Sequence, residues 1–401
     1  MTERLATLLR EEAELLEIPS PPADAVLTQG RGLRRRRTAT RAVAAVAVVA
    51  AGVAGGAAIT SQAADSRRTI VSPAAQAYLN GGAFSVGSTI YFGDAGEYRA
   101  HVDEKIKVLY YTSAGVLART GTSPWTDSEG PSHFSLVTPD GTVTQLDLDL
   151  GDRVPATDPT TPYLAYSVAD GDGWDIVVRN VNGGDIVAQV PVPGERSEGG
   201  WESPPVAIYG DFVYVAMKNG VSAVNWHTGT VSTPAWFAGE TFPEVSGGHF
   251  SHSDADAAIV SDAATGAELL RVPVGDYGWL DLSPDGRYAK LVSEEGPNAP
   301  VKVYDVAAGT AVSFPQLDGD VGWAPDGHLI GLAGDTLTTC DPASGSCEST
   351  DVAIERVPSS PASTTTERMC FPDKDTCTDD QVIHDQDENN VVKIGGNAYE
   401  S

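Results

Sequence analysis

The sequence predicts an all-β repeat protein, on the evidence of its composition, its regularly spaced turn glycines and the Asp or Asn residues that precede them. The 401 residues include 42 Gly and 26 Pro, which require many turns and exclude a helical bundle. Apolar residues make up 41% of the chain, enough to form a buried core. The 26 basic and 55 acidic residues give a net charge of −29, which argues against nucleic acid as a partner because phosphate binding needs clustered cations.

Charge is distributed unevenly and divides at an apolar run. Residues 1–41 contain eight Arg and six acidic residues, whereas the rest of the chain carries 18 basic and 49 acidic residues. Residues 42–59 have no charged or polar side chain and would span about 27 Å as a helix. The positive-inside rule therefore predicts a cytoplasmic stub at 1–41, a transmembrane helix at 42–60 and an exported remainder. The arginines that orient this helix are Arg34, Arg35, Arg36, Arg37 and Arg41.

Two alternatives for the apolar run remain open. It could be a buried core helix, or the apolar part of a cleaved signal, since Ser61, Gln62 and Ala63 offer small residues at a suitable spacing. The long segment that precedes the run is unusual for a signal. A twin-arginine signal fits poorly, because Arg36 and Arg37 are followed by Thr, Ala and Thr. We therefore expect a retained single-pass anchor in the cell membrane.

The stub contains the pattern of one short amphipathic helix. Its apolar residues recur at helical spacing opposite charged ones: Leu5, Leu8, Leu9, Ala13 and Leu16. The following PSPPADAV ends the pattern, since proline does not continue a helix. A helix this short is marginal in water, so a cytoplasmic partner or the membrane surface would have to order it. The alternative is a solvated stub without a partner.

The expected exported segment repeats with a period of about 41 residues. Its turn glycines lie 36 to 45 residues apart: Gly96, Gly141, Gly184, Gly229, Gly266, Gly309 and Gly345. Five of them follow an Asx residue by four positions: Asn180, Asn225, Asp262, Asp305 and Asp341. An Asx side chain accepts hydrogen bonds from the turn backbone, and glycine adopts the left-handed conformation. Each site therefore predicts a hairpin between the two outer strands of a unit.

Two further segments predict inner strands. WLDLSPDGRYAKLVS at 279–293 and VGWAPDGHLIGLAG at 321–334 each read as strand, Pro-Asp-Gly turn and strand. Four strands per period are typical of a β-propeller blade. On these motifs, residues 83–395 resemble the WD-repeat, TolB-type and quinoprotein-like propellers. The turns at 283–286 and 324–327 match the TolB-type turn, and 262–266 is similar to the quinoprotein turn.

This resemblance implies a fold and says little about activity, because its motifs consist of residues that form turns. The chain also departs from the pattern of these families. Leu269 and Leu270 lie near the place of the quinoprotein tryptophan, and no Gly-His or Trp-Asp pairs mark true WD repeats.

We expect about seven four-stranded blades in residues 83–395, with six or eight as alternatives, after a linker at 61–82 and before a tail at 396–401. An eighth hairpin could lie in 381–394. Propellers often close by pairing strands from both ends of the chain, so residues 88–102 could complete a blade that begins near the C-terminus.

Four cysteines form two pairs with identical six-residue gaps: Cys340, Cys347, Cys370 and Cys377. An exported domain favours disulfides, whereas structural zinc sites favour gaps of two to four residues. Four cysteines allow three pairings, and proximity favours 340–347 with 370–377.

The sequence predicts no catalytic site and no cofactor. No G-x-S-x-G motif occurs, and TDSEGPSHF at 126–134 spaces its Asp and Gly wrongly for a sialidase Asp box. His249, His252, Asp254 and Asp256 could ligate a metal, but His249 and His252 would face opposite sides of a strand.

Calcium remains a weak alternative at three acidic groups, for which solvated loops are the simpler interpretation. These groups are Asp170, Asp172 and Asp175; Asp373, Asp375, Asp379 and Asp380; and Asp385, Asp387 and Glu388. Trp125, Trp201 and Trp236 could stack on a sugar or a peptide, or pack beneath a blade edge.

The function that we expect is a non-catalytic binding or scaffold module for a protein, peptide or cell-envelope ligand, in a bacterial protein by its Ala, Gly and Arg richness. One alternative is a transmembrane signalling protein whose residues 1–41 bind a cytoplasmic regulator, since the stub, arginine cluster and single span are similar to those of bacterial membrane-bound anti-sigma factors. A second alternative is an exported enzyme.

Overall fold

The computed structural model describes residues 71–396 with short gaps. The gaps are 127–129, 152, 197–202, 238–243, 255, 275–277, 294–299, 318–319, 360–362, 372–375 and 385–386. The stub, the apolar run at 42–60 and the tail after Gly396 lie outside the described residues. Within the described part, no helix is both long and apolar enough to cross a membrane.

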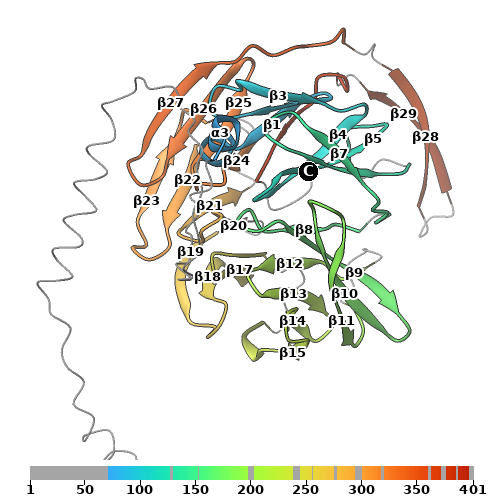
Figure 1. Ribbon diagram of the computed structural model, residues 1–401, viewed down its shortest axis with the longest axis vertical. Coiled ribbons are helices and arrows are strands. Elements are labelled where there is room, and N and C mark those ends of the chain that lie inside the picture. The colour runs from blue at the N-terminus through green and yellow to red at the C-terminus, as the bar shows by residue number, and fades with distance from the viewer. Residues whose placement is uncertain are drawn as a thin grey trace, which may run out of the picture. The chain divides into compact units, whose positions relative to one another are not determined.

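The described chain forms seven four-stranded antiparallel sheets arranged around a ring, and Figure 1 shows them as the blades of a β-propeller. This confirms the expected all-β class and the count of seven blades. Blades are numbered here around the ring, and the strands of each blade are given from the innermost to the outermost.

Blade 1 consists of β30 (Val392–Ile394), β1 (Ala83–Val86), β2 (Thr89–Phe92) and β3 (Tyr98–His101). Blade 2 consists of β4 (Lys105–Thr112), β5 (Gly115–Gly121), β6 (His133–Val137) and β7 (Val143–Leu146). Blade 3 consists of β8 (Ala156–Thr157), β9 (Tyr163–Asp170), β10 (Gly173–Asn180) and β11 (Ile186–Pro193). Blade 4 consists of β12 (Val206–Tyr209), β13 (Phe212–Met217), β14 (Gly220–Asn225) and β15 (Thr230–Ser232).

Blade 5 follows the short 3-10 helix η1 (Ala235–Phe237) and consists of β16 (Glu244–Ser246), β17 (His249–Asp254), β18 (Ala257–Asp262) and β19 (Glu268–Pro273). Blade 6 consists of β20 (Gly278–Leu282), β21 (Tyr288–Ser293), β22 (Val301–Asp305) and β23 (Ala311–Phe314). Blade 7 consists of β24 (Val321–Trp323), β25 (Leu329–Ala333), β26 (Thr336–Asp341) and β27 (Ser346–Asp351).

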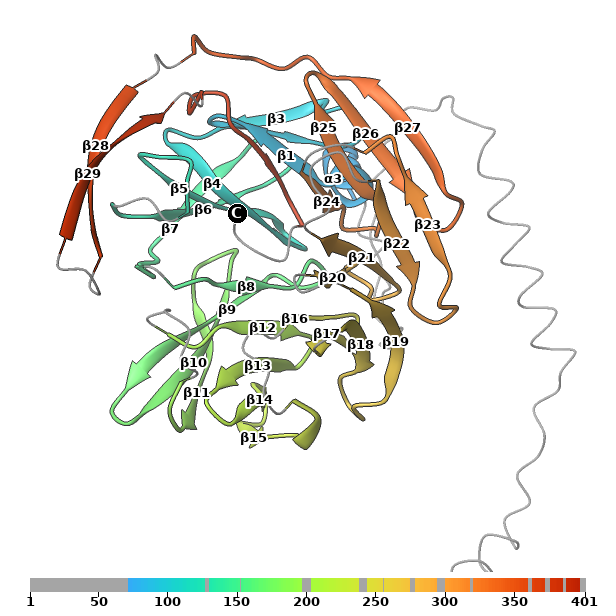
Figure 2. The ribbon, with the colours of Figure 1, turned by 180° about the vertical axis from the view of Figure 1, so that it is seen from behind.

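Strands from the two ends of the propeller close the ring. The late strand β30 pairs antiparallel with β1, with Phe84 opposite Ile394, and becomes the innermost strand of blade 1. The expected closure by both ends is therefore confirmed. Among the described residues of 381–394, no eighth outer hairpin forms, because β30 is used in this closure. Instead, β28 (Ser363–Phe371) and β29 (Thr376–His384) form a separate two-stranded sheet at the periphery (Figure 2).

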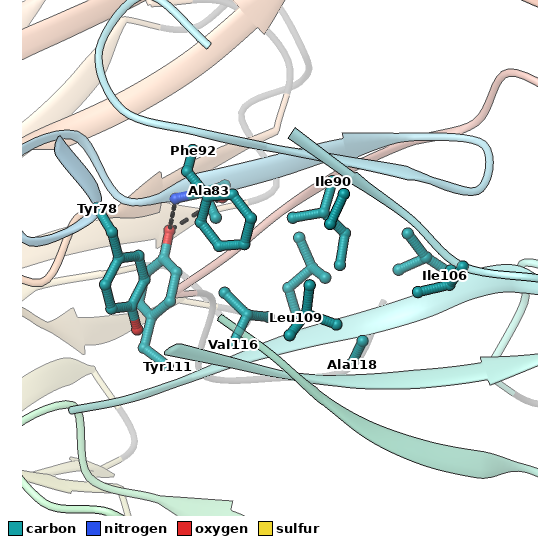
Figure 3. Packing of buried hydrophobic residues seen from close by; sticks show 12 residues of the cluster. Tyr78, Ala83, Ile90, Phe92, Ile106, Leu109, Tyr111, Val116 and Ala118 are labelled. Carbon is teal, nitrogen blue, oxygen red and sulfur yellow. Dashed lines mark hydrogen bonds between the residues drawn. The ribbon is translucent and has the colours of Figure 1, made fainter. Parts of the chain in front are cut away.

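The segment expected as a linker contributes a helix packed on the propeller. Helix α3 (Pro73–Gly81) begins after Ser72, whose side chain accepts a hydrogen bond from the Ala75 N–H, and has proline in its first turn. Its Tyr78 is 2% exposed and donates to the Thr112 carbonyl at 2.8 Å. Figure 3 shows Tyr78 beside Phe92 and Tyr111 in one apolar cluster. The burial of this aromatic ring fixes the helix on blades 1 and 2.

Local hydrogen bonds explain the outer turns. All seven predicted glycines have positive φ, from 59° to 90°, and connect the two outermost strands of a blade. We call these seven connections the rim turns. In the five with an Asx residue, the glycine N–H donates to the Asx carbonyl at 2.8 Å. The Asx side-chain oxygen also accepts from a backbone N–H two or three residues later. The predicted hairpin chemistry is confirmed.

The core lies between neighbouring blades, because each sheet buries apolar side chains on both faces. Ile176 and Val178 of blade 3, for example, belong to the same cluster as Val213 and Val215 of blade 4, and all four are fully buried. Such packing holds the inner strands in a ring and so places their side chains around one central space.

Candidate functional site: the central cavity

The innermost strands enclose a cavity of about 350 Å³, which we call the central cavity. All seven blades contribute lining residues through these strands or the segments next to them, for example Val108, Ala156, Val206, Glu244, Leu282, Trp323 and Gly396. Most of the wall is apolar. A small number of polar groups in a largely apolar concave site is the usual composition of a ligand pocket.

A buried polar network occupies one side of the wall. Asp281 on β20 and Lys290 on β21 form an ion pair at 2.9 Å, with side chains only 5% and 8% exposed. The Lys290 ammonium also donates to the Val321 carbonyl of blade 7. Glu244 on β16 accepts a hydrogen bond from the Leu282 N–H at 2.6 Å. These contacts connect the inner parts of blades 5, 6 and 7.

The two carboxyl groups of the network have perturbed pKa values. Burial and then the Asp281 charge raise the pKa of Glu244 well above its ordinary value. Burial also raises the pKa of Asp281, although the Lys290 ammonium opposes this. A hydrogen bond between the carboxyls raises the pKa of Glu244 and lowers that of Asp281. Burial therefore raises the pKa of both carboxyl groups, and the interaction between them favours the proton on Glu244.

Two more polar groups border the central cavity. Trp323 on β24 is 1% exposed, and its side chain lies beside the Asp281 carboxylate, whose pKa it lowers. Arg153, before β8, lines another part of the wall and donates from Nε to the Leu150 carbonyl at 2.6 Å. The wall therefore presents cationic, anionic and neutral polar groups.

This arrangement suits binding. Asp281 is paired with Lys290, and the raised pKa of Glu244 favours its uncharged form. Within the described residues, no group of three or more His, Cys, Asp or Glu side chains could hold a metal ion.

The residues that the sequence singled out lie elsewhere in the structure. The rim turns are at the outer strands, away from the central cavity. Cys340 and Cys347 form a disulfide across β26 and β27, which confirms that predicted bridge. Cys370 and Cys377 are directly opposite each other in the register of β28 and β29. Arg34, Arg35, Arg36, Arg37 and Arg41 lie outside the described residues.

The candidate histidines and tryptophans have structural contacts. His249 contacts the Gly286 carbonyl at 2.8 Å, whereas His252 contacts the Ser261 hydroxyl at 3.1 Å. Lys393 lies over the ring of Trp125, and Trp236 lies over the turn at Gly266. Trp201 lies outside the described residues.

Sequence reasoning missed Glu244, Asp281 and Trp323 as members of one site. A signal was present at Asp281, an acidic residue between Leu280 and Leu282 in a strand that ends at a Pro-Asp-Gly turn. An acid in a buried strand needs a partner. The partners come from β16, β21 and β24, so their proximity had no local signature.

The described chain is therefore a seven-bladed β-propeller with an internal cavity. No protein-family model matches the chain, and no curated protein is similar to it in sequence. Solved structures with similar backbones include a putative 6-phosphogluconolactonase from Bacteroides uniformis, at 11% identity and a TM-score of 0.43, covering 67% of this chain and 94% of that one.

Two other similar structures are TolB and BamB. TolB from Acinetobacter baumannii is 15% identical, with a TM-score of 0.38 and 65% of this chain and 64% of that one covered. BamB from Moraxella catarrhalis is 12% identical, with a TM-score of 0.34 and 65% and 90% covered. At these identities the likeness is one of general fold and assigns no activity, substrate or partner.

Proposed function

We propose that this protein is a membrane-anchored, non-catalytic binding module whose propeller recognises a protein, peptide or cell-envelope ligand outside the cytoplasm. The central cavity is the observation that carries the proposal, because it combines an apolar wall with a few polar groups supplied by separate blades. A rigid ring of inner strands offers such a site preformed, which lowers the entropy cost of binding.

Selection of ligands on the full-length protein tests this function. Peptide libraries and fractionated envelope components are presented to the protein, and affinity for each selected ligand is measured. Val108→Trp on the innermost strand of blade 2 should abolish binding, because the larger side chain fills the central cavity. Val143→Trp on the exposed outermost strand of the same blade is the matched control and should retain it. Ligands that bind both variants equally would contradict the proposal.

The proposed location outside the cytoplasm rests on charge and on the disulfide. Arginines crowd the N-terminal side of the apolar run, and a Cys340–Cys347 bridge suits an oxidising compartment. A reporter that is active only outside the cytoplasm, fused after Ser401, should be active. Neutral replacements of Arg34 to Arg37 and Arg41 should weaken that orientation, and activity of a cytoplasmic reporter instead would contradict the topology.

A signalling role is the second candidate, favoured by the amphipathic pattern and the arginine cluster of residues 1–41. In this role the stub would bind a cytoplasmic regulator. Capture of a transcription regulator by the full-length protein, lost when Leu8 and Leu9 are both changed to Glu, would support it. Retention of the regulator by that variant would contradict a helix-mediated contact.

A further inference from the structure

The lining of the central cavity includes a partly exposed arginine at one end of the wall that blade 3 contributes. Arg153 is the first of the consecutive lining residues 153–157, and its Nε donates to the Leu150 carbonyl at 2.6 Å. Leu150 is fully buried in the core between blades 2 and 3, so this contact holds one edge of the guanidinium. The two Nη atoms have no partner among the described residues. Their four N–H donors remain for a further acceptor.

The other charged groups of the wall are already balanced. Asp281 is paired with Lys290 at 2.9 Å, and both side chains are almost fully buried. Glu244 accepts a hydrogen bond from the Leu282 N–H at 2.6 Å, and burial raises its pKa and so favours its uncharged form. Arg153 is the one cation among the described lining residues. It therefore gives this part of the wall one positive charge that no described group compensates.

The charge of the whole chain makes this local cation informative. A net charge of −29 disfavours anions over most of the protein surface, so a preference for an anion requires a positive group at the site itself. A carboxylate suits a guanidinium, because its two oxygens accept two parallel N–H bonds and its single charge balances that of Arg153. A phosphate monoester would bring a charge of about −1.5 to −2 into a cavity that also contains two carboxyl groups. The wall therefore favours a carboxylate.

The remainder of the wall determines what carries the carboxylate. Val154, Val206, Val245 and Leu282 are among its apolar lining residues. An apolar body gains free energy when it leaves water for such a surface. The volume of about 350 Å³ lies near the lower end of the range of about 300–1,000 Å³ for small-molecule pockets. The central cavity therefore accommodates a small apolar group and not a folded chain.

We propose that the central cavity binds a small apolar group that carries a carboxylate, with the carboxylate at the Nη atoms of Arg153 and the apolar part against the wall. Arg153 is the residue that determines the charge of the ligand. The C-terminal residue of a peptide and a free organic acid both supply this chemistry. The inference deepens the proposed binding function and rests on it for the location of the site.

Four aromatic probes test the chemistry on the full-length protein. N-acetyl-phenylalanine and its amide differ only at the carboxyl group, phenylacetate is a free organic acid, and phenethylamine is the cation. Their dissociation constants are measured by NMR titration at neutral pH. N-acetyl-phenylalanine should bind at least about tenfold more tightly than its amide, because only the acid offers a charged acceptor to the guanidinium. Equal binding of acid and amide, or tightest binding of phenethylamine, would overturn the inference.

The two acids distinguish the source of the carboxylate. Tighter binding of N-acetyl-phenylalanine than of phenylacetate would support a peptide C-terminus, and the reverse order would support a free organic acid. Both orders support the carboxylate site, provided that both acids bind more tightly than the amide.

Variants locate the interaction. Arg153→Gln removes the charge and should reduce the advantage of N-acetyl-phenylalanine over its amide to near unity. Arg179→Gln is the matched control, because Arg179 donates to the Asp147 carbonyl at 2.8 Å in the same connection between β7 and β8 but does not line the central cavity. It should retain the full preference. An unchanged preference in a folded Arg153→Gln protein would overturn the inference.

A second variant covers the case in which Arg153→Gln does not fold. Arg153→Lys keeps the charge but loses the paired donors of the guanidinium, so it should lower the preference for the acid severalfold without abolishing it. A preference identical to that of the native protein would overturn the inference. Val108→Trp should exclude all four probes, because it fills the central cavity.

The outcomes separate this inference from the proposed function. A selected peptide or envelope ligand that is lost in Val108→Trp but unaffected by Arg153→Gln would retain the binding function and overturn the carboxylate contact. Binding of N-acetyl-phenylalanine that requires Arg153, without any selected macromolecular ligand, would support the contact and contradict the binding-module proposal.

Discussion

The rim turns and the wall of the central cavity belong to the same blades but follow different rules. Five rim turns repeat one structure, in which an Asx residue and a glycine four positions later form the same 2.8 Å backbone hydrogen bond. The polar groups of the wall occur once each, as with Glu244 in blade 5, Asp281 in blade 6 and Trp323 in blade 7. Turn geometry depends on a few neighbouring residues, so it recurs wherever the same Asx and glycine residues recur in the sequence. A site assembled from separate blades need not leave any repeat.

Ion pairs show the same contrast in their burial. Asp281 and Lys290 lie within 2.9 Å of each other with almost no exposed surface. Arg271 on the outermost strand β19 and Asp254 at the end of β17 form an outer pair at 2.6 Å, but their side chains are 45% and 49% exposed. Water screens the outer pair, whereas the inner charges depend on each other. Distance alone therefore does not measure what an ion pair contributes to stability.

Removal of the inner cation should produce the largest effect. Lys290→Met leaves Asp281 buried without its counter-charge and should lower the free energy of unfolding by about 3–5 kcal/mol. Urea denaturation at neutral pH measures this loss. Arg271→Met breaks the exposed outer pair and should leave stability almost unchanged. Equal losses of unfolding free energy in the two variants would show that burial does not distinguish the inner ion pair from the exposed one.

Loss of the rim disulfide should have an intermediate effect. Changing both Cys340 and Cys347 to Ser opens a ring of eight residues, which should cost about 2.5 kcal/mol on the chain-entropy model. The melting temperature should fall slightly, and ligand binding should persist because the bridge is on the outer strands. Non-reducing peptide mapping that found a link between Cys340 and Cys370 would contradict the local pairing.

The stability contributed by Glu244 in the wall and that contributed by Glu268 on the rim should depend on pH in opposite directions. The folded-state pKa of Glu244 is raised, so the stability that its proton provides is complete below the ordinary Glu pKa and is lost as pH rises towards the folded value. Glu244→Gln should remove this loss, which amounts to at most about 1.4 kcal/mol per pH unit for one proton. Urea denaturation measured from acidic to alkaline pH tests the slope.

Glu268 on the rim is the matched control for the pH series. Hydrogen bonding to Arg271 lowers the pKa of Glu268, so its contribution is present above the ordinary Glu pKa and is lost as pH falls. Glu268→Gln should therefore alter only the acidic end of the profile, and only weakly because the pair is exposed. The same slope change in both variants would show that Glu244 is not the titrating group.

A single rim glycine should have the smallest effect. Gly309 has φ of +66° with open space around an added Cβ, so Gly309→Ala should cost about 1 kcal/mol through backbone strain alone. Gly309→Asn should cost less, because Asn tolerates the left-handed region. Thermal unfolding of both variants tests this order. An alanine variant as stable as the native protein would show that the turn relaxes to another conformation.

The sequence determined the repeat and its turns because their causes are short-range. An Asx oxygen and a glycine four residues later are sufficient to reverse the chain, so Asp262 and Gly266 could be assigned without any knowledge of the remaining blades. The local pairing of Cys340 with Cys347 followed for the same reason, since both flank one rim turn.

Only the tertiary structure decided how the ring closes and what its centre contains. The pairing of β30 with β1 joins segments about 300 residues apart, and helix α3 packs through Tyr78 on strands that follow it. Glu244, Asp281 and Trp323 are polar residues on three different inner strands, and none of these short strands predicts the others. They form one buried network because blade packing brings these strands around one cavity, where burial raises the pKa of both carboxyl groups.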